Sequence, residues 1–271
     1  MPSILFRKIR SLWRLTFGNP LRSVPELRGR VGHIEGVRSS SQALAYQEIA
    51  ESLVFAVQYV THGCVEGDVA EFGCMTGRTA VALAAGMKWQ NSNKRLFLFD
   101  SFEGLPTATS EIDRSNRHVF AGTWGPGTCL GISPAKLQRL CGRFIADDRV
   151  RIFEGWFSNT LPTLPPAIKF ALVHIDCDLY QSTYDALDYL FGSARITEGA
   201  IILFDDWDCN RASNQHGERR AWSEIEEKYS VITSPRGSYG WAGYKLIVHS
   251  YVAPKLGTRE KSAASLGEGR G

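Results

Sequence analysis

Two runs of apolar residues end in aspartate clusters, and they constrain the fold more than any other feature of this chain. Residues 170–175 precede Asp176, and residues 200–204 precede Asp205 and Asp206. Short continuous apolar runs are typical of strands buried on both faces of a sheet. Carboxylates crowded at the ends of two such strands repel one another, and a bound cation relieves that repulsion. Because all these ligands are oxygens, the pattern indicates a hard ion such as Mg²⁺ rather than Zn²⁺.

Residues 68–88 predict a strand, a glycine loop and an Ala-rich helix in succession. Glycines let the backbone approach a ligand closely, and the start of the helix offers free N–H groups, so this turn can hold a nucleotide-like molecule. The spacing is Glu71-x-Gly73-x-x-x-Gly77. A dinucleotide fingerprint would need glycine at positions 71, 73 and 76, where this chain has Glu71 and Thr76. The loop therefore predicts S-adenosylmethionine rather than NAD, with Glu71, Gly73 and Gly77 at the cofactor.

The next apolar run, 95–100, ends in Asp100 and is followed by Ser101. A carboxylate at such a strand end can accept hydrogen bonds from both ribose hydroxyls of an adenosine. Asp100 is therefore the predicted ribose ligand, with Ser101 beside it in the cofactor site.

Five motifs spread over residues 65 to 250 resemble one known family. They lie at 71–77, 99–106, 153–162, 174–183 and 204–207. In these segments the chain is similar to the macrocin O-methyltransferase family, whose members use S-adenosylmethionine and a divalent metal to methylate sugar hydroxyls in antibiotic biosynthesis. The resemblance implies that Asp176, Asp205 and Asp206 hold the metal and that Asp176 is the general base. The chain departs from the family at Trp207, where a tyrosine is usual, and this departure concerns the acceptor more than the chemistry.

Strand and helix patterns alternate along the chain, which predicts a doubly wound, mainly parallel α/β sheet with helices on both faces, like that of class I methyltransferases. Expected helices are 41–63, 77–88, 134–143 and 183–192, and expected strands are 68–72, 95–100, 149–154, 170–175 and 199–204. Ligands of such sheets bind beyond the carboxyl ends of the strands, where the acid clusters and the glycine loop fall. We expect one methyltransferase domain over 41–250, a basic flap or arm over 1–40 and a disordered tail over 251–271.

The chain has 271 residues, of which 44% are hydrophobic, so it can bury a full core. Its six cysteines are scattered and include no Cys-x-x-Cys pair, which favours a reduced, cytoplasmic location. Residues 1–40 hold eight Arg or Lys against two Glu, a charge of +6, so the other residues sum to −3. This local charge excludes a nucleic-acid platform and allows either peripheral membrane contact through residues 1–22 or a flap or homo-oligomer arm.

Several residues near these motifs have alternative interpretations. The irregular segment 105–131 is predicted to be a substrate-side lid or a surface insertion. Asp178 is favoured as a helix N-cap over a metal ligand, and His174 as a core residue over a base. His216 lies in a loop from which it could approach the acceptor.

The predicted acceptor is a small molecule or glycan, but the sequence does not identify it. A catechol-like phenol would use the same metal chemistry as a sugar diol. An NAD-dependent dehydrogenase or epimerase is disfavoured by the glycine spacing, and a non-catalytic relative by the intact Asp176, Asp205 and Asp206.

Overall fold

The computed structural model describes residues 34–254, with side chains from Tyr46 onward. The predicted membrane contact or flap of residues 1–22 lies outside this part of the chain, as does most of the predicted disordered tail. Both therefore stay predictions. All six cysteines are described, and all are free.

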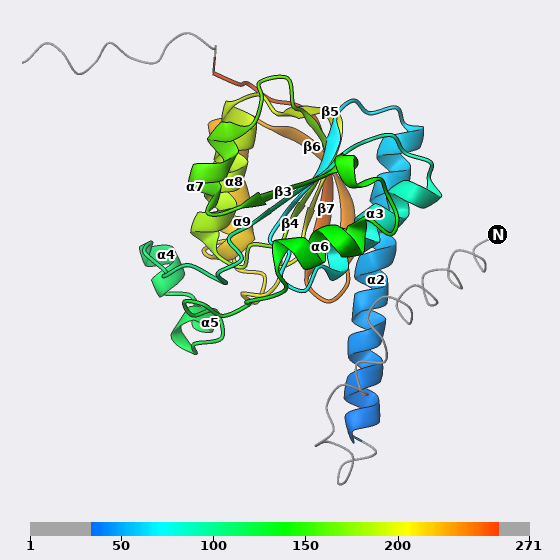
Figure 1. The fold of residues 1–271 in the computed structure, drawn as a ribbon. Coiled ribbons are helices and arrows are strands. Elements are labelled where there is room, and N and C mark those ends of the chain that lie inside the picture. The colour runs from blue at the N-terminus through cyan, green and yellow to red at the C-terminus, as the bar shows by residue number, and fades with distance from the viewer. Residues whose placement is uncertain (1–33, 255–271) are drawn as a thin grey trace, which may run out of the picture.

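A seven-stranded sheet in the order β3-β2-β1-β4-β5-β7-β6 forms the centre of the molecule (Figure 1). The strands are β1 (Asp68–Phe72), β2 (Leu96–Asp100), β3 (Val150–Glu154), β4 (Phe170–Ile175), β5 (Ile196–Phe204), β6 (Ile232–Tyr239) and β7 (Gly243–Ser250). Strands β1 to β5 pair in parallel, and β7 runs antiparallel between β5 and β6. The predicted mainly parallel sheet is confirmed, and the β6–β7 hairpin extends it beyond the strands that the sequence predicted.

Helices cover both faces of this sheet, as Figure 1 shows. The helices are α2 (Ile34–His62), α3 (Arg78–Trp89), α4 (Glu111–Arg114), α5 (Arg117–Phe120), α6 (Pro134–Cys141), α7 (Phe157–Thr160), α8 (Tyr180–Gly192) and α9 (Gly217–Lys228), with short 3₁₀ turns η3 (Asp147–Arg149) and η4 (Leu161–Thr163). Helices α2, α3 and α6 pack on one face and α7, α8 and α9 on the other, whereas α4 and α5 belong to the segment 105–131. No helix in the described part of the chain is long and apolar enough to cross a bilayer.

Alternate side chains of the central strands enter opposite cores, which is why these strands read as continuous apolar runs. Val69 and Leu98 pack toward α2 and α3, whereas Phe72 and Phe99 pack toward α7 and α8. The rings of Phe72 and Phe99 stack with their centroids 4.7 Å apart. The sheet is therefore buried on both faces, which leaves its carboxyl edge as the place for a ligand.

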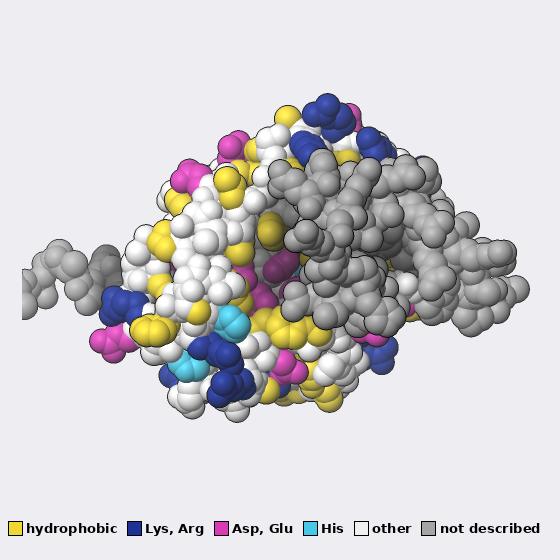
Figure 2. All heavy atoms as spheres, turned by 90° about the horizontal axis from the view of Figure 1, so that it is seen from below, with side chains coloured by type: hydrophobic (Ala, Val, Ile, Leu, Met, Phe, Trp, Pro, Cys, Tyr) yellow, Lys and Arg dark blue, Asp and Glu magenta, His cyan; other side chains and the backbone are white. Residues whose placement is uncertain are grey.

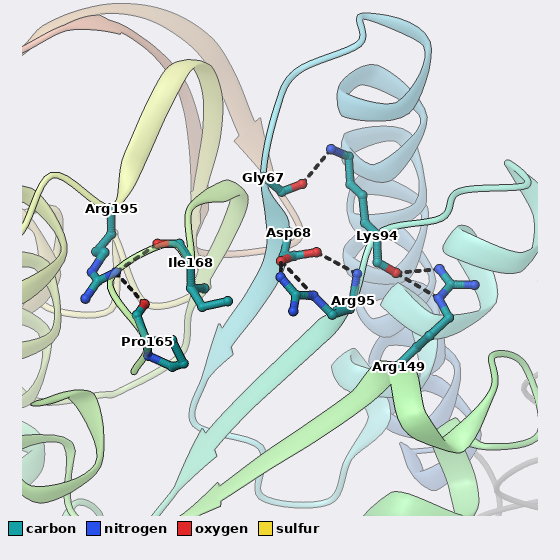
Figure 3. A network of polar contacts seen from close by, with 8 residues as sticks. All are labelled: Gly67, Asp68, Lys94, Arg95, Arg149, Pro165, Ile168 and Arg195. Carbon is teal, nitrogen blue, oxygen red and sulfur yellow. Dashed lines mark hydrogen bonds and ion pairs between the residues drawn. The ribbon is translucent and has the colours of Figure 1, made fainter. Parts of the chain in front are cut away.

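Basic side chains tie the opposite, amino edge of the sheet together (Figure 3). Asp68 at the start of β1 forms an ion pair with Arg95 at 2.6 Å. The Arg149 guanidinium donates to the carbonyl of Lys94. The buried Arg195 donates to the carbonyls of Pro165 at 2.7 Å and Ile168 at 3.2 Å. These contacts hold the loops at the edge of the sheet that lies away from the site.

Replacing Arg195 by alanine is expected to lower the free energy of unfolding by about 3 kcal/mol, because several largely buried carbonyls would lose their donor. Denaturant unfolding checks this value. The control is Arg236→Ala, since Arg236 is exposed on β6 and makes no ion pair among the described residues. An equal loss of unfolding free energy in the two variants would contradict the stabilising role of the Arg195 hydrogen bonds.

Candidate active site

A cavity of about 480 Å³ opens at the carboxyl edge of the sheet. Its wall includes residues of the glycine loop and of both acid clusters that the sequence singled out. In Figure 2 the surface is hollowed at this place, and acidic side chains are visible inside. The predicted site residues that line it are Gly73, Asp100, Ser101, Asp176, Asp205 and Asp206.

Asp100 connects the end of β2 to the glycine loop. Its Oδ2 accepts hydrogen bonds from the backbone N–H of Cys74 at 2.6 Å and of Met75 at 3.1 Å, and its Oδ1 accepts one from Phe102 at 2.7 Å. The neighbouring Ser101 donates its hydroxyl to the carbonyl of Gly104. Asp100 therefore holds the loop in shape, and it is one of the residues that line the cavity.

Gly73 brings the glycine loop into contact with the acid cluster. Its φ is 86°, and a Cβ at this position would lie 1.8 Å from the carbonyl oxygen of Asp176. Only glycine tolerates both the left-handed backbone and this approach. Gly77 also has a positive φ, of 74°, but it begins α3 and packs against Leu137 rather than lining the cavity.

Four carboxylates gather on the floor of the cavity: Asp176 and Asp178 after β4, and Asp205 and Asp206 after β5. Burial raises the pKa of all four carboxyls above their ordinary values. The pKa of Asp205 rises to about 6 through burial and then through the negative charge of Asp206. Such a cluster favours the arrival of a cation.

Two side chains that the sequence did not single out hold Asp206 in place. The Cys209 thiol donates to its Oδ1 at 2.8 Å, and the buried Glu218 accepts from its backbone N–H at 2.9 Å. Its Oδ2 is buried and has no hydrogen-bond partner among the described residues. One oxygen of the cluster is thus left with unused capacity to bind a ligand.

Glu71 and His174 form a buried pair between β1 and β4. The Nδ1 of His174 lies 2.9 Å from Oε1 of Glu71, and neither side chain is exposed. Neither of them lines the cavity. The interpretation of His174 as a core residue agrees with this geometry. The cofactor role of Glu71 stays a prediction.

The N-cap interpretation of Asp178 is wrong. Helix α8 begins one residue later than that interpretation requires, with Leu179 at the N-cap position and no cap from its own side chain. Asp178 has a left-handed backbone, with a φ of 60°, and lines the cavity. The cap comes instead from Asp113 of α4, whose carboxylate accepts from the N–H groups of Tyr180 at 2.8 Å and Gln181 at 3.1 Å.

The segment 105–131 therefore lies directly at the carboxyl edge of the sheet. Residues 105–109 and Asp113 line the cavity, as does Cys129.

Trp207 and His216 lie outside the cavity wall. The ring of Trp207 stacks on Tyr244 with centroids 5.1 Å apart. The tryptophan that stands in place of the family's usual tyrosine therefore changes the packing around the site rather than the residues that line the cavity.

Comparisons with known proteins identify the family of this chain. The profile of the family described as "Macrocin-O-methyltransferase (TylF)" matches residues 43–234. The 8-demethyl-8-(2,3-dimethoxy-alpha-L-rhamnosyl)-tetracenomycin-C 4'-O-methyltransferase of Streptomyces olivaceus is 29% identical over 67% of this chain and 69% of its own. The mycinamicin III 3''-O-methyltransferase of Micromonospora griseorubida is 27% identical over 64% of this chain and 69% of its own.

Solved structures share the fold. The O-methyltransferase NovP matches with a TM-score of 0.62 and 23% identity over 74% of this chain and 79% of its own. The calicheamicin methyltransferase CalS11 matches with a TM-score of 0.58 and 21% identity over 89% of this chain and 91% of its own. Because the family profile covers well over half of the residues, the chain belongs to the macrocin-O-methyltransferase family and is an S-adenosylmethionine-dependent O-methyltransferase.

Proposed function

We propose that this enzyme methylates a hydroxyl of a sugar or glycosylated small molecule with the help of a divalent cation held by Asp176, Asp205 and Asp206. The observation that carries the proposal is the contact of Gly73 with Asp176, which joins the cofactor loop and the acid cluster in one cavity. The Streptomyces olivaceus relative supports a sugar acceptor, since its name gives a rhamnosyl compound as the substrate of its O-methylation.

The chemistry of the acid cluster fits a hard cation. The ligands are oxygens, the pKa of each carboxyl is raised by burial, and Oδ2 of Asp206 has no partner among the described residues. No group of three His, Cys, Asp or Glu side chains in the described chain already has the spacing of a metal site. The proposal therefore requires the carboxylates to move closer together when the ion binds. A divalent cation there would lower the pKa of the acceptor hydroxyl and position its oxygen.

The residues of the two halves of the site have separate tasks. Gly73 and Asp100 position the cofactor, which supplies an electrophilic methyl group on its sulfonium. Asp176 lies on the shared floor and is the proposed general base that takes the proton from the acceptor hydroxyl. Holding two reactants in line within one cavity supplies much of the rate.

Asp100→Ala is expected to weaken S-adenosylmethionine binding by about 1–3 kcal/mol, because a charged hydrogen-bond partner is lost and the loop amides of Cys74 and Met75 lose their acceptor. Calorimetric titration measures this change. The control is Asp208→Asn, which removes an acid outside the cavity wall that pairs with Arg219. Binding of NAD in place of S-adenosylmethionine would refute the cofactor site.

The acceptor class is tested with a panel of rhamnosides, other glycosides with adjacent hydroxyls and simple catechols. Each is incubated with S-adenosylmethionine and Mg²⁺, and the methylated product is identified by mass spectrometry. Methylation of the glycosides supports the proposal. Methylation of the catechols alone would replace it with phenol methylation.

A further inference from the structure

A second pocket lies beside the cavity and is basic where the cavity is acidic. It lies between α5 and the loop that follows β5. Its lining residues are Ser115, Arg117, Asn210, Arg211, Ser213 and His216. Figure 2 shows basic and His side chains gathered next to the hollow in which the acidic ones are visible.

The two arginines of this pocket are not engaged elsewhere in the described chain. Neither Arg117 nor Arg211 makes an ion pair with any described residue, and no carboxylate lines the pocket. Most other arginines near the site have partners, such as Arg219 with Asp208 and Arg220 with Glu224. Two guanidinium groups beside a histidine, without a counter-charge, form a place that favours an anion.

The residues that line this pocket follow closely in the chain on residues of the acidic cavity, although no residue lines both. Asp113 lines the cavity, and Ser115 and Arg117 follow it along the chain. On the other side, the Cys209 thiol contacts Asp206, and Arg211 lies two residues further on, a span of at most about 7 Å between Cα atoms. Nε2 of His118 lies 3.0 Å from the carbonyl of Cys209, so the two walls are joined. A ligand that reaches from the acid cluster to the pocket would therefore be short.

The backbone of the loop is also unusual. Arg211 and Ala212 are consecutive residues with left-handed φ angles of 56° and 55°, a conformation that residues with a side chain seldom adopt. Strained backbone of this kind clusters at active sites, ligand-binding segments and switch regions.

We infer that this pocket binds a phosphoryl group carried by the acceptor, so that the enzyme acts on a sugar phosphate or sugar diphosphate. This inference rests on the proposed function for the identity of the methylated group. Arginine matches phosphate oxygens with two parallel hydrogen bonds, and two arginines suit the multiple charge of a diphosphate better than a single carboxylate. The sugar would then lie at the acids with its phosphate in the pocket.

Binding is tested on the full chain by calorimetry with pyrophosphate, a nucleoside diphosphate and glucuronate as probes. A chelator is present, so that no cation can bridge a probe to the acid cluster. Pyrophosphate and the nucleoside diphosphate are expected to bind, more weakly as salt rises. Arg117→Gln and Arg211→Gln should each weaken this binding about tenfold or more. Arg114→Gln is the matched control, since Arg114 lies on the same segment but outside the pocket lining.

The outcomes separate this inference from the proposed function, because binding of a probe needs no methyl transfer. No phosphate binding, unchanged binding in both pocket variants, or binding of glucuronate alone would overturn it. A loss of probe binding in Asp205→Asn would assign the phosphate to the acid cluster and overturn it as well. Methylation of neutral glycosides with the same KM in the wild type and the two pocket variants would likewise argue against a phosphorylated acceptor.

Discussion

Asp205→Asn is expected to lower kcat of methyl transfer by at least about a hundredfold while S-adenosylmethionine affinity stays within about twofold. The substitution keeps the shape of the side chain and removes one negative charge from the acid cluster. Asp205 follows β5, whereas the glycine loop follows β1 and Asp100 ends β2, so the cofactor contacts remain. Steady-state kinetics and calorimetry on the same preparation measure the two quantities.

The cation requirement has its own test in the wild type. A chelator should abolish turnover, and Mg²⁺ should restore it. The control for Asp205→Asn is Asp208→Asn. It makes the same Asp-to-Asn change at an acid that pairs with Arg219 and lies outside the cavity wall. Full activity in excess chelator would disprove the metal role and leave the acids to act directly on the acceptor.

Gly73→Ala should lower the free energy of unfolding by more than about 4 kcal/mol, or prevent folding altogether. The added Cβ would lie 1.8 Å from the carbonyl oxygen of Asp176, so the ends of β1 and β4 would have to separate. Denaturant unfolding gives the magnitude. If the variant does not fold, its yield of soluble protein is the readout.

Gly237→Ala provides a matched control for backbone strain. Gly237 has the same φ of 86° as Gly73, but a Cβ there would meet no atom within 4 Å. Its substitution should cost only the left-handed conformation, about 1–2 kcal/mol. Equal destabilisation of the two variants would mean that the Gly73 contact is not tight.

The central strands could be predicted because burial on both faces leaves an unbroken apolar run in the sequence. Strand β6 could not, since its side chains are mostly exposed and it contains Pro235 and Gly237. Its place in the sheet depends on pairing with β7, which is a property of two segments together. The helix over 41–63 was predicted, although it begins earlier, at Ile34.

The strand-end acids could be predicted to meet because parallel strands bring their carboxyl ends to one edge. The position of Asp178 in the cavity could not be predicted from the local sequence pattern, because an Asp just before a helix predicts an N-cap. The left-handed backbone at Asp178 turns it to the cavity instead. The true cap, Asp113, lies 67 residues before Tyr180 in the chain, and no local signal connects the two.

The carboxylate of Asp113 has a consequence for anyone who wishes to redesign acceptor choice. The segment 105–131 is the natural piece to exchange between relatives, since it lines the cavity and is the predicted substrate-side lid. That same segment caps the start of α8, a helix of the core, through two hydrogen bonds from backbone N–H groups to Asp113. A graft that omits an acid at this position would leave the N–H groups at the start of α8 unsatisfied beside the acid cluster. Transplanted loops therefore need to be chosen for this anchoring residue first and for acceptor contacts second.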